Sequence, residues 1–579
     1  MVMHFGGVAI EAAPMSRLAT MARSGYSSAK SRKSMKKPLG LETLTCGKCA
    51  IREASETMAL PGANLPPGDR GSRRRRRCRA ASCRYSSPPV FRRAAFLLSL
   101  ALMCAHAAAG ELSLVPANMP RVGTIDERFQ SYNIEMAEVT GAPFWRPYAE
   151  PTNASHSGLF SERKPKDLTN ARLRKLAAAL SPALVRISGT SANTTYFAEK
   201  DDAPSTPPPG FKSVLTYPQW RGVVEFSRAV EAPIVTSFAI STGTRDARGA
   251  WKPDQARSLL AATRSMGGRI AAAELMNEPD LPAIGGAPDH YDAAAFARDF
   301  AVFRAFMKQE APGVLMLGPG TASGPSGAAK AFAAAVGGVD TFTYHYYGAV
   351  SKRCGGKQTP DAALSETWLS RTDRTFAFYR ALRDRLAPQK PIWLTETAEA
   401  ACGGDAWSAT FLDTFRYLDQ LGRLARAGVR IVMHNTLAAS DYGLLDERTF
   451  IPRPTYWGAL LWRKLMGTVV LDPGVPIQKG LHVYAHCERQ VSGGVTLLVI
   501  NNGRSGARTL ALPGPSERYT LDAARLQGAA VRLNGTALAL DDGDQFPRLT
   551  GVKTAAGPLT FAPSTITFLA IPGAGNGAC

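Results

Sequence analysis

Two glutamates have the residue type and surroundings for acid–base and nucleophilic chemistry. Glu278 lies in the stretch ELMNEPD (274–280), and Glu396 lies in WLTET (393–397). Two carboxyl groups can cleave a glycosidic bond when one is protonated and donates to the leaving oxygen. The other must be an ionised carboxylate on the opposite side of the anomeric carbon. A separation of about 5–5.5 Å between them is typical of a retaining, double-displacement mechanism.

Neither glutamate is specific evidence by itself. A glutamate at the end of a strand is commonly a salt-bridge or capping partner, so the case for Glu278 depends on the fold. Asn277 is the expected contact of a sugar 2-hydroxyl, a bond that strengthens in the transition state. The other carboxylates nearby are given lesser roles: Glu274 is interpreted as structural, Glu399 as a solvated or secondary loop residue, and Asp280 as a loop residue with no assigned task.

The elements that must position the two glutamates form a regular alternation. Apolar, β-prone runs are each followed by an Ala/Leu/Arg-rich helical stretch, such as 170–180, 290–308 or 410–428. Eight such units predict a (β/α)8 TIM barrel, with a doubly wound sheet as the alternative. Glu278 and Glu396 would then end strands four and seven, across the barrel mouth from each other. The predicted strands are 128–136, 183–189, 233–241, 269–279, 314–320, 340–348, 391–397 and 429–437.

The pattern changes on both sides of the barrel, which is expected to span 126–467. After the last barrel helix at 456–467, short strands separated by turn residues predict a β-sandwich over 468–579. The piece 110–125 is expected to add a strand to that sandwich. Within the barrel, the Pro-rich segment 191–220 is predicted to be a long loop, which would shape a substrate cleft.

The charge of the chain is unevenly distributed. Its 579 residues carry a net charge of +22, but residues 1–109 hold 19 Lys/Arg against 5 Asp/Glu, while 110–579 hold 50 against 42. The arginine run at 73–77 could indicate a nucleic-acid arm. It has no partner motif around it, so no nucleic-acid partner is expected.

The stretch 90–109 has the parts of a secretory signal. Arg92 and Arg93 precede an apolar run over 94–104, and small residues suited to cleavage follow. The run is too short to span a membrane. We therefore expect an exported protein, periplasmic or secreted, without stable membrane insertion, and we leave open whether Cys104 is lipidated. Residues 1–89 are expected to be an upstream extension that is non-native or disordered.

Four cysteines follow the signal, namely Cys354, Cys402, Cys487 and Cys579. In an exported protein four cysteines suggest two disulfides, and the sequence alone permits three pairings. There is no glycine-rich phosphate loop, zinc-spaced His/Cys cluster or nucleotide fingerprint, so we expect no cofactor and no metal.

Six motifs in fixed order make the chain resemble glycoside hydrolase family 79, the heparanase and β-glucuronidase family, over nearly all of 126–579. They are LRKLAAALSPALVRISGT (173–190), AELMNEP (273–279), YHYYG (344–348), WLTETAEAACGG (393–404), VMHNTLAASDYGLLDE (432–447) and YWGALLWRKLMGTVVL (456–471). The resemblance implies that Glu278 is the acid/base and Glu396 the nucleophile.

The same resemblance implies further sugar contacts. Glu135, at the end of strand one, stands where the family has an aspartate, and Thr190 follows strand two. His345 and Tyr347 end strand six near the nucleophile. His345 is interpreted as a satisfied barrel-mouth histidine, as a hydrogen-bonding support for Glu396, or as both.

Recognition of a uronic acid requires donors aimed at its carboxylate. The resemblance points to backbone N–H groups of Gly403 and Gly404 and to the hydroxyl of Tyr442. It also implies a sandwich disulfide between Cys487 and Cys579. We expect Cys354 and Cys402, in loops after the neighbouring strands six and seven, to form the second disulfide and to brace the glycine loop.

The expected function is therefore that of a retaining β-glucuronidase, a monomer that cleaves within heparan sulfate or a related glucuronate-containing polysaccharide. An exo-acting β-glucuronidase is the first alternative. A retaining enzyme for neutral sugars and a non-catalytic carbohydrate-binding protein are the others.

Overall fold

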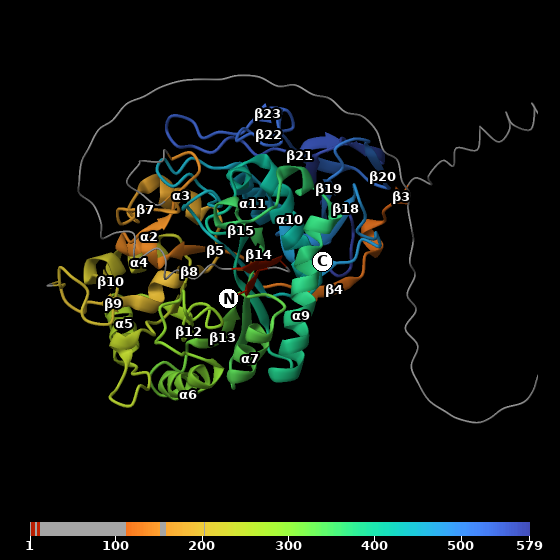
Figure 1. The fold of residues 1–579 in the computed structure, drawn as a ribbon. Coiled ribbons are helices and arrows are strands. Elements are labelled where there is room, and N and C mark those ends of the chain that lie inside the picture. The colour runs from red at the N-terminus through yellow and green to blue at the C-terminus, as the bar shows by residue number, and fades with distance from the viewer. Residues whose placement is uncertain (1, 6–7, 12–111, 151–157, 202) are drawn as a thin grey trace, which may run out of the picture. The chain divides into compact units, whose positions relative to one another are not determined.

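A closed barrel of parallel strands forms the centre of the protein (Figure 1). The computed structural model describes residues 2–5, 8–11, 112–150, 158–201 and 203–579. The prediction of a (β/α)8 barrel is confirmed, because all eight predicted strands form in order and the last pairs with the first. The barrel strands are β5 (Gln130–Glu135), β8 (Val185–Ser188), β11 (Ile234–Ser237), β12 (Ile270–Glu274), β13 (Leu315–Thr321), β14 (Thr341–Val350), β15 (Ile392–Ala401) and β16 (Ile431–His434).

The barrel strands are apolar because almost every strand residue is buried. Side chains such as Leu184, Val235, Leu317, Trp393 and Met433 make a small cluster of their own, as expected for the filled interior of a barrel. The opposite faces of the strands contribute to the large core beneath the helices. Burial on both sides explains why the strands read as continuous apolar runs in the sequence.

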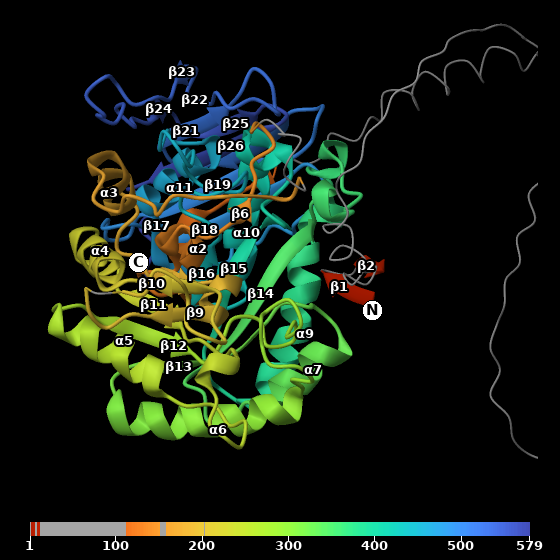
Figure 2. The same ribbon diagram turned by 60° about the vertical axis from the view of Figure 1, so that its left-hand side comes forward.

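Helices surround the strands, and α5, α6 and α7 lie outside the barrel in Figure 2. Side chains cap the first turns of two other barrel helices. At the start of α3, Asn170 accepts the Leu173 N–H, and at the start of α4, Thr216 forms a capping box with Gln219. The main barrel helices are α3 (Ala171–Ala178), α4 (Tyr217–Ala229), α5 (Asp254–Ser265), α6 (Ala293–Glu310), α7 (Gly327–Ala335), α9 (Arg371–Leu386), α10 (Phe411–Arg426) and α11 (Pro454–Leu465). Two shorter helices are α2 (Met136–Thr140) and α8 (Glu366–Leu369).

Two of the expected segments differ from the structure. The fourth strand was expected to reach 279, but β12 ends at Glu274 and a turn carries the chain onward. The segment 191–220 is not a loop throughout. It contains the 3-10 helix η3 (Thr190–Thr194) and the short parallel strands β9 (Thr195–Phe197) and β10 (Ser213–Leu215), and α4 starts within it.

The C-terminal part is built from two sheets whose strands pair antiparallel, except that β20 and β3 pair in parallel. One sheet has the order β23-β22-β21-β26-β19-β18-β17-β4, with β24 on β21, and the second has the order β25-β20-β3. Apolar residues of both sheets, including Val483, Val499, Leu510 and Phe561, share one core. The strands are β3 (Leu112–Ser113), β4 (Arg121–Thr124), β17 (Met466–Leu471), β18 (His482–Glu488), β19 (Val495–Asn501), β20 (Arg508–Leu512), β21 (Ser516–Asp522), β22 (Arg532–Leu533), β23 (Thr536–Ala537), β24 (Val552–Thr554), β25 (Gly557–Phe561) and β26 (Thr565–Ile571).

Residues before the barrel contribute strands to these sheets, since β3 pairs with β20 and β4 pairs with β17. The division into domains at 126 and 467 stays a prediction.

Helix α10 of the barrel contacts strand β18 of the sheets. Asp419 on α10 accepts a hydrogen bond from the Tyr484 hydroxyl and contacts His482, and both of these residues lie on β18. Although burial lowers the pKa of His482, Asp419 raises it to about 9, so this histidine is charged at neutral pH.

The expected signal at 90–109 lies outside the described residues. Of the expected upstream extension, only 2–5 and 8–11 are described, and they form the paired strands β1 (Val2–Phe5) and β2 (Val8–Glu11). Among the helices that the structure describes, none is both long enough and apolar enough to cross a membrane.

Candidate active site

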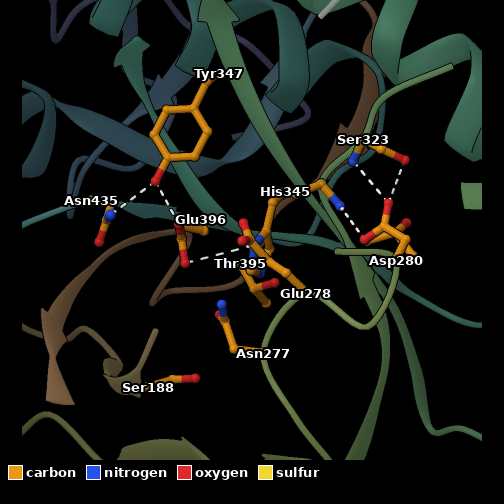
Figure 3. Close-up of polar contacts among 12 residues, drawn as sticks. Ser188, Asn277, Glu278, Asp280, Ser323, His345, Tyr347, Thr395, Glu396 and Asn435 are labelled. Carbon is orange, nitrogen blue, oxygen red and sulfur yellow. Dashed lines mark hydrogen bonds and ion pairs between the residues drawn. The ribbon is translucent and has the colours of Figure 1, made fainter. Parts of the chain in front are cut away.

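Glu278 and Glu396 lie together at the mouth of the barrel. Glu396 lies in the middle of β15, and Glu278 lies in the turn after β12. One oxygen of each carboxyl group and one ring nitrogen of His345 lie within 4.8 Å of one another. Figure 3 shows these three side chains at the centre of a group of polar contacts. The carboxyl side chains keep a little exposure, 13% for Glu278 and 7% for Glu396, so both can be reached.

The turn that carries Glu278 is held by side chains. Glu278 has a φ of 49°, in the left-handed region that non-glycine residues rarely occupy, and its carbonyl accepts the Leu281 N–H at 3.0 Å. On the preceding residue, the Asn277 N–H donates to Asn193 Oδ1 at 2.8 Å, and Asn193 Nδ2 donates to the Asn277 carbonyl at 2.9 Å. A residue of the β8 loop therefore fixes the entry to the turn.

Glu278 is in an environment that favours its protonated form. Burial raises its pKa to about 8; the negative charges of Asp280 and Glu274 add to the rise, and Arg186 opposes it. At neutral pH the carboxyl group can therefore donate a proton. An elevated pKa at one of two neighbouring carboxyl groups is the property required of a general acid.

His345 is neutral, and its proton can be placed. Burial lowers its pKa to about 4. Its Nε2 lies 3.4 Å from Nη2 of Arg186, which can only donate, so Nε2 is the acceptor and Nδ1 carries the proton. Nδ1 lies 3.0 Å from Oε1 of Glu278 and donates to it. The proton of Glu278 is then left on Oε2, available to a leaving group.

The second carboxyl group accepts hydrogen bonds on both oxygens. Tyr347 donates its hydroxyl proton to Glu396 Oε1 at 2.5 Å, and Arg186 Nη1 donates to Oε2 at 2.9 Å. The Tyr347 hydroxyl in turn accepts from Asn435 Nδ2 at 2.9 Å, as the dashed lines in Figure 3 show. Such donors suit an ionised carboxylate that is aimed and ready to attack.

Arg186 is a site residue to which the sequence analysis assigned no role. It lies in β8 with 1% exposure and connects three strands. Besides Glu396, it binds Glu274 Oε1 through Nη2 at 2.5 Å and Nε at 2.9 Å, and Asn277 Oδ1 at 2.7 Å. The signal for it was a single charged residue inside an apolar strand run, because arginine is almost never fully buried without a partner.

The contacts of Arg186 also orient two neighbouring side chains, Glu274 and Asn277. Glu274 is a buried carboxylate tied to Arg186 and Ser188, in keeping with its interpretation as structural. Because arginine only donates, the amide oxygen of Asn277 must face Arg186, and its NH2 group is left to donate elsewhere.

The predicted hydrogen-bonding partner of His345 is Glu396. The shorter contact of this histidine is with Glu278, and its Nδ1 lies 3.6 Å from Glu396.

Glu135 and Thr190 have different surroundings. Glu135 ends β5, is buried and caps α2 together with Glu138; burial and the charge of Glu396 raise its pKa well above the ordinary value. A Cβ on Gly189 would lie 1.5 Å from Glu135 Oε2, so glycine at that position makes room for the longer carboxylate arm. Thr190 begins η3 and is exposed, without a side-chain hydrogen bond to any other described residue.

The expected uronate contacts lie beside Tyr347. The Tyr442 ring stacks 6.5 Å from the Tyr347 ring, and its hydroxyl accepts from Asn435 at 3.3 Å. Gly403 and Gly404 have φ values of 82° and 81°, and a Cβ on Gly404 would lie 3.2 Å from the Cβ of Tyr442. Neither glycine N–H bonds to a group in the described part of the chain, so both can serve a ligand.

Both expected disulfides form. One joins Cys354, after β14, to Cys402, which directly precedes the glycine pair; the other joins Cys487 to Cys579.

The prediction that Glu399 is a solvated or secondary loop residue is wrong. It lies buried in β15 and accepts the Asp405 N–H at 2.9 Å and the Ser408 hydroxyl at 2.5 Å, and burial raises its pKa to about 8. It therefore braces the loop after the glycine pair.

Comparisons with known proteins show similarity to glycoside hydrolases. The family described as "Glycosyl hydrolase family 79, N-terminal domain" matches residues 165–422. Among curated proteins, the chain is 34% identical to baicalin-beta-D-glucuronidase of Scutellaria baicalensis, over 40% of this chain and 45% of that protein. It is 28% identical to heparanase-like protein 1 of Arabidopsis thaliana, over 67% and 73%, and 32% identical to bovine (Bos taurus) heparanase, over 42% and 46%. The first and last of these matches cover less than half the length of the relative.

A solved structure carries the same fold. The 4-O-alpha-L-rhamnosyl-beta-D-glucuronidase of Fusarium oxysporum 12S aligns with a TM-score of 0.54 at 15% identity, over 80% of this chain and 99% of that one. The family match covers both the turn after β12, which carries Glu278, and β15, which carries Glu396. Over residues 165–422 the chain is therefore similar to glycosyl hydrolase family 79, and its curated relatives include proteins named heparanase and β-glucuronidase.

Proposed function

We propose that the protein is a retaining glycoside hydrolase that cleaves β-glucuronidic linkages within heparan sulfate. The observation that supports it most is the pair Glu278 and Glu396, with carboxyl oxygens within 4.8 Å of each other at the barrel mouth. This separation is close to the ~5–5.5 Å of double-displacement enzymes and shorter than the ~6.5–9.5 Å of inverting enzymes.

The two carboxyl groups divide the reaction between them. In the first step Glu396 attacks the anomeric carbon while Glu278 Oε2 gives its proton to the leaving oxygen, and a glycosyl–enzyme ester forms. In the second step Glu278, now a carboxylate, takes a proton from water as that water attacks the same carbon, which releases Glu396. Arg186 and Tyr347 hold the nucleophile throughout, and His345 holds the proton donor by its second oxygen.

The pH dependence of the reaction follows from Glu278. The group must be protonated to act, and its pKa is about 8, so the donor is lost as the pH rises through that value. We expect kcat/KM to fall above about pH 8 with a slope of one proton. A profile from pH 5 to 10 with a 4-nitrophenyl β-glucuronide measures it, and a basic limb that already falls between pH 5 and 6 would contradict the assignment.

Binding of the substrate carboxylate is assigned to the backbone N–H groups of Gly403 and Gly404 and to Tyr442. These donors bind an anion without placing a further cation next to Glu278. Tyr442→Phe is expected to lower kcat/KM for a glucuronide about ten-fold or more, because hydrogen bonds to charged groups contribute about 1.5–3 kcal/mol. The matching glucoside, which has no carboxylate, is the control. An equal effect on both substrates, or on neither, would favour an enzyme for neutral sugars.

Action within heparan sulfate is supported by the relatives named heparanase and by the excess of basic over acidic residues in 110–579. Exo action is the second candidate, favoured by the relative named baicalin-beta-D-glucuronidase. Product sizing after digestion of heparan sulfate separates them. Shortened fragments support the proposal, while release of monosaccharide alone supports exo action.

The two disulfides support export to an oxidising compartment.

A further inference from the structure

Asp280, two residues after Glu278, was expected to be a loop residue without a task, but the structure surrounds its carboxylate with donors. Oδ1 accepts the Ala322 N–H at 3.0 Å, and Oδ2 accepts the Ser323 N–H at 2.8 Å and the Ser323 hydroxyl at 2.5 Å. The residue is only 6% exposed. Figure 3 shows Asp280 and Ser323 joined by dashed lines beside His345.

These contacts connect two segments of the barrel mouth. Ala322 and Ser323 directly follow β13, and the Ser323 hydroxyl also contacts the hydroxyl of Ser326 at 2.6 Å. Ser326 caps α7 by accepting the Ala329 N–H at 3.0 Å. Asp280 thus ties the turn after β12 to the loop after β13 and, through it, to the start of a helix.

The turn needs such an attachment. Strand pairing ends at Glu274, and Glu278 has a left-handed φ of 49°, which is unfavourable for a residue with a side chain. Asn193 holds the turn at Asn277, on one side of Glu278. Asp280 holds it on the other side, so the strained residue lies between two anchors.

We propose that Asp280 is a positioning residue for Glu278: it fastens the turn to the loop after β13, and its negative charge favours the proton-donating form of Glu278. The inference rests on the proposed function, in which Glu278 is the general acid. In this role Asp280 acts through the turn that carries Glu278, without contact to the sugar or to the reacting atoms.

The charges facing Glu278 are few. Asp280 and Glu274 are negative, Arg186 is positive and His345 is neutral. The proposed nucleophile Glu396, a carboxylate in the reaction, also has an oxygen within 4.8 Å of Glu278. The phenols of Tyr347 and Tyr379 also face this region, and burial raises the pKa of each, so both stay uncharged. Burial raises the pKa of Asp280 as well, while bonds from Ser323 and Ala322 oppose that rise. Asp280→Asn therefore removes one of three carboxylates near Glu278 (Asp280, Glu274 and Glu396) and leaves the positive charge of Arg186 in place.

Asp280→Asn tests the proposal. The upper limb of the pH profile of kcat/KM is expected to move down by about one pH unit, as for a like charge removed from partly buried surroundings. At pH 7 kcat is expected to fall about ten-fold, with KM changed less than about three-fold, because a displaced catalytic group costs rate rather than binding.

Ser323→Ala is the matched control. It removes one hydrogen bond to Asp280 and leaves the charge, so its upper limb should stay within about 0.2 pH unit of the wild-type value. Equal shifts in the two variants, or an unmoved limb in Asp280→Asn, would overturn the proposal. Thermal melting of both variants shows whether each is folded.

A second measurement needs no turnover. The C=O stretch of a protonated carboxyl group can be followed by infrared titration and assigned to Glu278 by its loss in Glu278→Gln. Its midpoint should fall by about one pH unit in Asp280→Asn. An inactive wild-type protein would refute the proposed function while this titration still tested Asp280. An unmoved midpoint would refute the role of Asp280 alone.

Discussion

Glu396→Gln is expected to lose almost all turnover of a β-glucuronide and to keep its affinity for the intact substrate. Glutamine has nearly the same shape but cannot form the glycosyl ester, so kcat should fall on the order of 10⁴-fold or more, the scale seen when a nucleophile is removed. Binding should persist because the amide oxygen can still accept from Tyr347 or Arg186. Steady-state kinetics and calorimetric titration of the variant with substrate measure the two effects.

Glu399→Gln is the matched control on the same strand. Glu399 is fully buried, three residues further along β15, and its pKa of about 8 makes it neutral at pH 7, so glutamine is a close replacement. We expect kcat within about three-fold of the wild-type value, since no charge is lost at neutral pH. Loss of activity in both variants would show damage to β15 rather than loss of a nucleophile. Retained turnover in Glu396→Gln would show that another group is the nucleophile.

Arg186→Lys is expected to cause the second largest loss. Lysine keeps the charge, but its single ammonium cannot reproduce a planar fork that binds Glu274, Asn277 and Glu396 together. A fall in kcat of about 10²–10³-fold is expected, comparable to removal of one preorganised donor. Breaking a buried charge network also costs about 3–5 kcal/mol of stability, which denaturant unfolding measures.

Arg245→Lys separates these two effects. Arg245 forms a buried pair with Asp299 and donates to the Ile240 carbonyl at 2.6 Å, without contact to either catalytic glutamate. A comparable loss of stability with unchanged kcat is expected. If Arg186→Lys merely matched this control, with stability lowered and kcat kept, the role of Arg186 in holding the nucleophile would be refuted.

The barrel could be predicted from the sequence because its strands are buried on both faces. A continuous apolar run followed by an amphipathic helix has few other structures to form, and all eight runs became barrel strands. Strand ends were less predictable: β12 stops at Glu274 because the following turn is held by Asn193 and Asp280, whose partners lie elsewhere in the chain.

The two glutamates could be predicted from their strand positions, whereas their surroundings could not. Arg186 was overlooked because its partners Glu274 and Glu396 lie 88 and 210 residues away, and only the closed barrel brings them together. Glu399 was taken for a loop residue because β15 continues beyond the apolar run, to Ala401. His345 could contact either Glu278 or Glu396. The choice depends on side-chain rotamers, which the pattern of strands in the sequence does not predict.

The central claim is that Glu396 forms a covalent bond to glucuronate during turnover. Incubation with 2-deoxy-2-fluoro-β-D-glucuronyl fluoride should slow breakdown of that intermediate, because fluorine at carbon 2 removes the hydroxyl contact that strengthens in the transition state. Peptide mass spectrometry should then find one added fluoroglucuronyl group, on the peptide that contains Glu396. An unlabelled protein that still turns over glucuronides, or a label on another residue, would contradict the account.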